Sequence, residues 1–101
     1  MLTSKQRAFL KNIAAKLQPI FQVGKNEISD NMTGQISDAL TAHELIKVSV
    51  LENSPYTPRE AADIISERTG SDVVLVVGRR FILYRETQDE KRRETRIILP
   101  K

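Results

Sequence analysis

The sequence predicts a single α/β domain in which three helices alternate with the strands of one mixed four-stranded sheet. Three segments carry apolar residues at helical spacing, and each follows a residue that can cap a helix. Short runs rich in Val, Ile and Leu lie between and after these segments. Only a turn separates the last two runs, which predicts an antiparallel hairpin. The expected order is helix, strand, helix, strand, helix, strand, strand, with two right-handed crossovers before the hairpin.

Length and composition are those of one small globular domain. The chain has 101 residues, of which 40% are hydrophobic and 29% charged, and at this size folding buries roughly 65% of the unfolded surface. No cysteine is present, which excludes disulfides and thiolate metal sites and fits a reducing compartment. The start of the chain lacks a signal-peptide core, and the longest apolar run, 73–77, is too short to cross a bilayer. We therefore expect a cytoplasmic protein with no membrane partner.

The first helix begins at Thr3, because Gln6 three residues later completes a capping box. An apolar stripe runs along it, and Pro19 closes the segment. Basic residues border this stripe on two diverging flanks, and no acidic residue relieves their repulsion. The stripe consists of Leu2, Phe9, Leu10, Ile13 and Leu17, with Arg7 and Lys11 on one flank and Lys5 and Lys16 on the other.

The middle of the chain supplies two strands and a helix. Residues 20–27 form a short strand that breaks into a tight loop, and Ser29 or Asp30 caps the second helix. Residues 45–51 form the next strand, in which alternation buries one face and leaves the other wet or functional. The helix has apolar Met32, Ile36, Ala39 and Leu40 with His43 in line, and the strand has Ile46, Val48 and Val50 opposite Lys47 and Ser49.

A third helix and a hairpin complete the core. Thr57, Pro58 and Glu60 predict the helix start, Ala61, Ile64 and Ile65 supply its apolar positions, and Gly70 predicts its end. Residues 73–77 lack polar alternation, so we expect a strand covered on both faces. The turn 78–80 leads to an antiparallel strand over 81–84. Residues 86–95 are polar and predict an exposed connection or mobile hairpin, and 96–100 predict an edge strand. The single domain over 1–101 thus has a core of about 1–85 and a charged extension over 86–101.

Charge is segregated along the chain. The net charge of +3 divides into +5 over residues 1–25, −6 over 26–77 and +4 over 78–101. The first of these segments contains no acidic residue at all. A basic surface on a body of modest net charge can steer and hold a polyanion such as a nucleic acid, although uneven charge also arises by chance.

The sequence offers little catalytic chemistry. The lone histidine, His43, lies near the end of a helix, where capping or packing is a simpler role than general-base catalysis. Asp38 and Glu44, and likewise Asp63 and Glu67, read as solvent-facing helix charges. One histidine with scattered carboxylates makes neither a metal site nor a catalytic group. We therefore expect no enzyme activity, cofactor, metal or small-molecule substrate.

The turn at Gly24, Lys25 and Asn26 is a candidate phosphate contact. Neither a P-loop nor a dinucleotide fingerprint is present. Gly24 permits close approach of a backbone, Lys25 supplies a point charge, and amides ahead of the next helix can meet a phosphate. The same three residues also suit an ordinary surface turn, so this motif taken alone leaves both interpretations open.

Several segments in one order resemble the CRM domain, named for chloroplast RNA splicing and ribosome maturation, in its stand-alone bacterial YhbY form. They are the lysine-rich first helix, PIFQVGKN at 19–26, HELIKV at 43–48, VVGRRFILYR at 76–85 and a final LP at 99–100. The resemblance implies a fold similar to the C-terminal domain of the third bacterial translation initiation factor. It also implies RNA binding, with ribosomal RNA in large-subunit precursors as the expected partner.

The family's signature loop is glycine, two variable residues and a second glycine, used like the loop of KH domains that clamps a nucleic-acid backbone. Its first three positions match Gly24, Lys25 and Asn26, but the fourth is Glu27, which removes a flexible residue and adds a negative charge. A distributed basic surface is therefore expected, with Lys25 as one contact among several. The expected RNA-binding residues are Lys5, Arg7, Lys11, Lys16, Gly24, Lys25, Asn26, Lys47, Arg79 and Arg80.

Aromatic residues for base stacking are scarce. Phe9, Phe21 and Phe81 lie in apolar patterns and are expected in the core, while Tyr56 and Tyr84 are less clearly placed. This favours recognition of RNA shape and backbone. An alternative function from another class is a protein adaptor that docks on a ribosomal protein or assembly factor through the acidic middle segment.

Overall fold

The computed structural model describes residues 2–86 of the chain. The predicted edge strand over 96–100, and all but Glu86 of the predicted connection over 86–95, lie outside the described residues. The predicted order of three helices and four strands is confirmed. The elements are α1 Ser4–Ala14, β1 Phe21–Val23, α2 Asp30–His43, β2 Leu45–Val50, α3 Pro58–Thr69, β3 Asp72–Val77 and β4 Arg80–Tyr84.

Helix boundaries follow the caps that the sequence contains. Thr3 with Gln6, and Thr57 with Glu60, each form a reciprocal capping box at the start of α1 and α3. Ser29, rather than Asp30, caps α2 by accepting a hydrogen bond from the Met32 amide at 3.0 Å. These side chains satisfy amide groups that the first helical turn leaves without a partner.

The four strands form one mixed sheet in the order β1-β2-β4-β3. β1 runs parallel to β2, with Phe21 opposite Val48, and β4 runs antiparallel to both of its neighbours. β4 therefore enters the sheet between β2 and β3, although it comes last among the strands of residues 2–86. A mixed sheet of four strands was the predicted arrangement.

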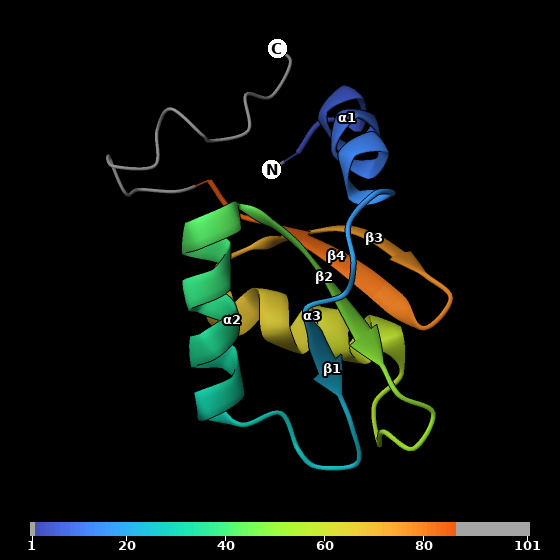
Figure 1. The fold of residues 1–101 in the computed structure, drawn as a ribbon, viewed down its shortest axis with the longest axis vertical. Coiled ribbons are helices and arrows are strands. Elements are labelled where there is room, and N and C mark those ends of the chain that lie inside the picture. The colour runs from blue at the N-terminus through green and yellow to red at the C-terminus, as the bar shows by residue number, and fades with distance from the viewer. Residues whose placement is uncertain (1, 87–101) are drawn as a thin grey trace.

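Helices cover both faces of the sheet and make two cores (Figure 1). Helices α2 and α3 pack on one face, where Ile46, Val48 and Phe81 are buried. Helix α1 packs on the opposite face through Leu10 and Ala14. Because α1 is the only helix on its side among the described residues, it covers part of that face and leaves part open.

The prediction that the strand over 73–77 is covered on both faces is confirmed in part. Val73 and Val76 pack against the core under α2 and α3, and Val74 packs in the core under α1. The covering is incomplete, because β3 is an edge strand, its Val77 is 56% exposed, and only Val74 within it is buried. The strand that is more completely covered on both faces is β4, in which the four residues after Arg80 are all buried. An unbroken apolar run indicates burial in general, but the position of a strand in the sheet depends on pairing partners distant in sequence.

Glu44 is not the solvent-facing helix charge that the sequence predicts. It follows the last residue of α2 with a positive φ of 64°, and it is 2% exposed. Its amide donates to the Leu40 carbonyl at 2.8 Å, and its own carbonyl accepts from the Arg85 amide at 2.9 Å. These two bonds turn the chain directly from α2 into β2, a turn at which glycine is the usual residue.

Candidate functional site

The outer surface of α1 is basic, as the sequence predicts. Lys5, Lys11 and Lys16, the last just beyond the end of the helix, are all exposed, and α1 contains no acidic residue. Phe9 is 37% exposed on this helix, so the expectation that it belongs to the core is wrong. Helical spacing of four residues places Lys5 and Phe9 on one side of α1. The ring therefore lies one turn from a cation on the same side of α1.

Arg7 plays a different part from the lysines of α1. Its guanidinium donates to the Val73 carbonyl at 2.5 Å and to the Val74 carbonyl at 3.2 Å, and the side chain is half-buried. These carbonyls lie where β3 changes register against β4, between Val73 and Leu75. Arg7 thus ties α1 to an irregular stretch of an edge strand, and this contact occupies the group predicted to bind RNA.

The loop after β1 is placed beside the end of β2. The Leu51 amide donates to the Val23 carbonyl at 2.9 Å, and a Cβ added at Gly24 would lie 3.8 Å from Leu51, an ordinary contact. Gly24 does not have a positive φ, and a Cβ would fit at this position, so the backbone does not require glycine here. Lys25 and Asn26 are exposed beyond it. The loop therefore offers the Lys25 side chain to a ligand.

The hairpin between β3 and β4 reaches the same end of the sheet. The Arg79 guanidinium donates to the carbonyls of Val50 at 3.0 Å and Leu51 at 2.5 Å, while the Arg79 carbonyl accepts from the Val50 amide at 2.7 Å. The loop at Lys25 and the hairpin at Arg79 are thus joined through the end of β2. Arg79 therefore holds the hairpin against the end of β2, although its side chain remains exposed.

Lys47 and Arg80 lie on the sheet face that α1 leaves open. Arg80 pairs with Ser49 across the strands, and Ser49 and Lys47 share a face because they are two residues apart. Ile82, two residues beyond Arg80, packs against α1 and identifies this as the α1 side. Arg80 is exposed and Lys47 half-buried. Both cations therefore lie between the lysines of α1 and the loop at Lys25, which Figure 1 shows at opposite ends of the molecule.

The opposite layer carries the acidic charge. Helices α2 and α3 together contain five acidic residues, all exposed, against two arginines. Arg59 pairs with Asp63 at 3.4 Å, and Arg68 donates to the Ile28 carbonyl at 2.8 Å. Segregation along the chain therefore becomes segregation across the sheet, with a basic α1 side and an acidic side made of α2 and α3. The five acids are Asp30, Asp38, Glu60, Asp63 and Glu67.

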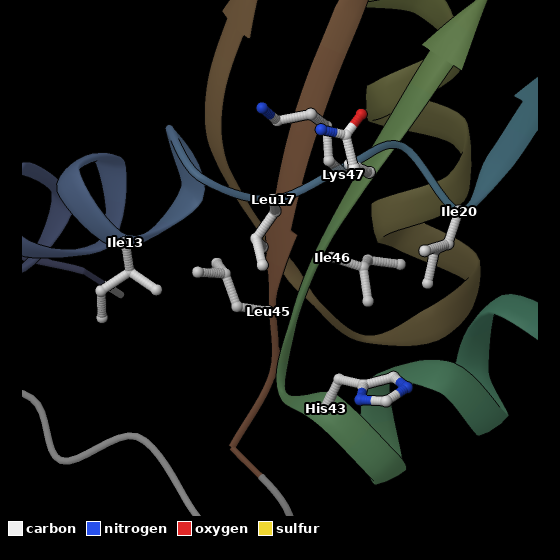
Figure 2. A pocket seen from close by; sticks show the side chains of 8 residues that line it. Ile13, Leu17, Ile20, His43, Leu45, Ile46 and Lys47 are labelled. Atoms are coloured by element: carbon white, nitrogen blue, oxygen red, sulfur yellow. The ribbon is translucent and has the colours of Figure 1, made fainter.

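A hollow of about 380 Å³ opens between α1, the start of β2 and the end of α2 (Figure 2). Its walls are mainly aliphatic, and its polar members are Gln18, His43 and Lys47. His43, the last residue of α2, is exposed at this hollow and is not packed in the core. No local sequence pattern indicates this hollow, because its lining comes from two stretches distant in the chain, 13–20 and 43–47. The aliphatic lining is Ile13, Leu17, Ile20, Leu45 and Ile46.

Two classes of site are not found in the part of the chain that the structure describes. Residues 2–86 contain no cluster of three or more histidine or acidic side chains arranged to hold a metal ion. Within the same residues, no helix has the length and apolar character needed to traverse a lipid bilayer.

Comparison with known proteins gives a consistent result. The family model of the CRS1 / YhbY (CRM) domain matches residues 2–85. The Bacillus subtilis protein named Probable RNA-binding protein YqeI is 45% identical over 94 residues, which cover 93% of this chain and 98% of that protein. A Haemophilus influenzae protein named RNA-binding protein is 33% identical over 90 residues, which cover 89% and 91% of the two chains.

A solved structure shares the fold. The solution structure of hypothetical protein SAV1595 from Staphylococcus aureus, described as a candidate RNA-binding protein, matches with a TM-score of 0.77 at 44% identity, covering 99% of this chain and 100% of that one. The fold, the family model and the relatives agree in the class of protein that they define. The chain belongs to the CRM domain family.

Proposed function

We propose that this protein binds RNA through its α1 side, without catalysis, and that its partner is ribosomal RNA during assembly of the large ribosomal subunit in the cytoplasm. The single observation that carries RNA binding is the separation of charge by the sheet. An α1 side without an acid on its helix attracts a polyanion, while the acidic helices α2 and α3 orient the molecule by repulsion. The names of the relatives support RNA as the partner.

The proposed surface is a subset of the predicted residues. Exposed lysines of α1, Lys47 and Arg80 on the open face, and Lys25 in the loop contact phosphates directly. Arg7 and Arg79 hold the elements that carry them, because their guanidinium groups bind backbone carbonyls. The exposed ring of Phe9 adds a surface on which a base can stack.

Salt titration tests this surface. Each phosphate contact contributes about 0.7 to 0.9 to the slope of log affinity against log salt concentration. The triple variant Lys5→Gln, Lys25→Gln and Arg80→Gln should therefore bind structured ribosomal RNA more weakly and with a slope shallower by about 2 to 3. A matched variant with Asp38→Asn, Asp63→Asn and Glu67→Gln on the acidic side should keep the slope. An unchanged slope in the basic variant would remove these residues from the site.

The adaptor function predicts a different outcome. If the exposed acids of α2 and α3 dock on a ribosomal protein, large-subunit precursors should retain this protein after nuclease digestion, and the acidic-side variant should be lost from them. Binding to RNA predicts release by nuclease together with direct binding of purified ribosomal RNA. Co-sedimentation with ribosomal particles before and after digestion separates the two, and crosslinking to rRNA then locates the contact.

A further inference from the structure

The hollow beside β2 lies where the sheet is incomplete. β1 pairs with β2 only from Phe21 opposite Val48 onward, and before it the Ile20 amide donates to the Lys47 carbonyl at 3.0 Å. Alternate residues of a strand direct their peptide groups to the same side, so the Leu45 peptide faces this same edge. Among the described residues, no strand pairs with Leu45 on that side. The hollow therefore borders an open edge of β2.

Apolar side chains line the hollow on both sides of that edge. Figure 2 shows Ile13 and Leu17 directed toward Leu45 on one side of β2, with Ile20, Ile46 and His43 grouped on the other. A flat group that enters between these two sets would meet aliphatic walls on its faces. Its rim would point toward the Leu45 peptide, which carries one donor and one acceptor.

Polar groups at the hollow suit a heterocycle joined to a phosphate backbone. The exposed Gln18 amide can donate and accept, as base edges require, and the exposed imidazole of His43 offers a further partner. Lys47 supplies a cation, and the exposed Lys16 precedes Leu17 in the chain. The volume of about 380 Å³ lies near the lower end of the roughly 300 to 1,000 Å³ typical of small-ligand sites. It is large enough for one base.

We propose that this hollow receives one unpaired base of the bound RNA, from a bulge or a single-stranded loop, while Lys47 and Lys16 contact the adjoining phosphates. This inference rests on the proposed function and adds a preference for an extruded nucleotide, the form in which RNA bases become accessible to proteins. Charge favours RNA over an added peptide strand, because residues 1–25 contain no acid and the hollow is continuous with the basic α1 side through Lys47.

Two variants of the full chain test the base site. Ile20→Trp places a larger side chain in the hollow at a residue that is 50% exposed. Gln18→Ala removes an exposed amide. The second variant preserves the test if the first one unfolds. Val77→Ala, at the opposite edge of the sheet and 56% exposed, is the matched control for altering an exposed apolar residue. The RNA probes are a hairpin with one bulged 2-aminopurine and a fully paired hairpin with the same number of phosphates.

The wild type should bind the bulged hairpin more tightly than the paired one, and 2-aminopurine fluorescence should change on binding. Ile20→Trp should weaken binding of the bulged hairpin about tenfold or more and abolish the fluorescence change, with paired-hairpin affinity and salt slope preserved. Gln18→Ala should act in the same direction, and Val77→Ala should have no effect.

Three outcomes would count against the base site in different ways. Equal binding of the two hairpins by wild type, with no fluorescence change, overturns it and leaves RNA binding intact. No binding of either hairpin, or of structured ribosomal RNA, overturns the proposed function as well. If the wild type binds a purified ribosomal protein and Ile20→Trp does not, while the affinity for RNA is unchanged, the hollow is assigned to a protein partner.

Discussion

At the scale of single residues, cations that look alike in sequence have different roles. Arg7 and Lys11 stand one turn apart on α1 with the same charge. The Arg7 guanidinium reaches two carbonyls of β3, whereas the Lys11 side chain is exposed. Both bonds come from one terminal nitrogen, Nη1, whose two N–H groups can donate to the two carbonyls at once. Arg79 likewise donates to two carbonyls at the other end of the sheet.

Arg7→Gln should therefore lower the free energy of unfolding by about 1 to 3 kcal/mol, because two half-buried carbonyls lose a charged donor. Lys11→Gln, which removes the same charge from an exposed position, should change it by less than about 0.5 kcal/mol. Urea denaturation followed by circular dichroism measures both. Equal stability of the two variants would show that the contact of Arg7 with β3 contributes nothing.

At the scale of elements, the helices follow their local sequence closely, since caps act within one turn. The capping box of α3 makes this dependence measurable by pH. Hydrogen bonds from the backbone amide of Thr57, and also the Thr57 side chain, hold the pKa of Glu60 below its ordinary value of 4.5. A carboxylate with a lowered pKa stabilises the folded state above its unfolded pKa, and this contribution disappears as the pH falls through the folded value.

Glu60→Gln should consequently be less stable than wild type at neutral pH, and the difference should shrink as the pH falls below 4.5. Thermal unfolding midpoints recorded across this acidic range provide the measurement. Glu67→Gln, near the end of the same helix, controls for the loss of one negative charge. A difference between wild type and Glu60→Gln that stays constant with pH would contradict the role of the ionised carboxylate.

At the scale of the whole molecule, Arg85 joins three elements at the end of β4. Its guanidinium donates to the Ser37 carbonyl at 2.6 Å, the Ser37 hydroxyl at 2.9 Å, the Thr41 hydroxyl at 2.8 Å and the Thr69 carbonyl at 2.7 Å. It thereby links α2 and α3 to the last described strand. Nothing in the local sequence distinguishes Arg85 from the exposed Arg80 five residues earlier.

Arg85→Lys should lower the free energy of unfolding by about 2 kcal/mol or more, because a lysine keeps the charge but cannot reproduce the forked geometry. Arg80→Lys, at the start of β4, should change stability by less than about 0.5 kcal/mol. Guanidinium chloride titrations of both variants give the comparison. If Arg85→Lys matches Arg80→Lys, charge alone suffices at the junction of α2, α3 and β4.

Sequence by itself determined the class of fold, the order of the elements and the family. It did so because caps, helical periodicity and turns act over a few residues, as Thr57 with Glu60 and Gly70 show at the two ends of α3. It also predicted that α1 is basic, because the charge of a side chain follows from the residue type alone. The resemblance to the CRM domain depends on several such local segments, which are spread along nearly the whole chain.

Tertiary structure alone decided which strand is central in the sheet, which cations remain exposed and where a ligand can enter. Strand pairing placed β3 at the edge and β4 inside, so 73–77 is covered less completely than its apolar pattern predicts. Contacts across 66 and 48 positions committed Arg7 and Arg85 to backbone and hydroxyl oxygens. The hollow beside Leu45 exists because β1 is shorter than β2. Each of these features depends on groups distant in the chain, and local sequence patterns carry no information on such pairings.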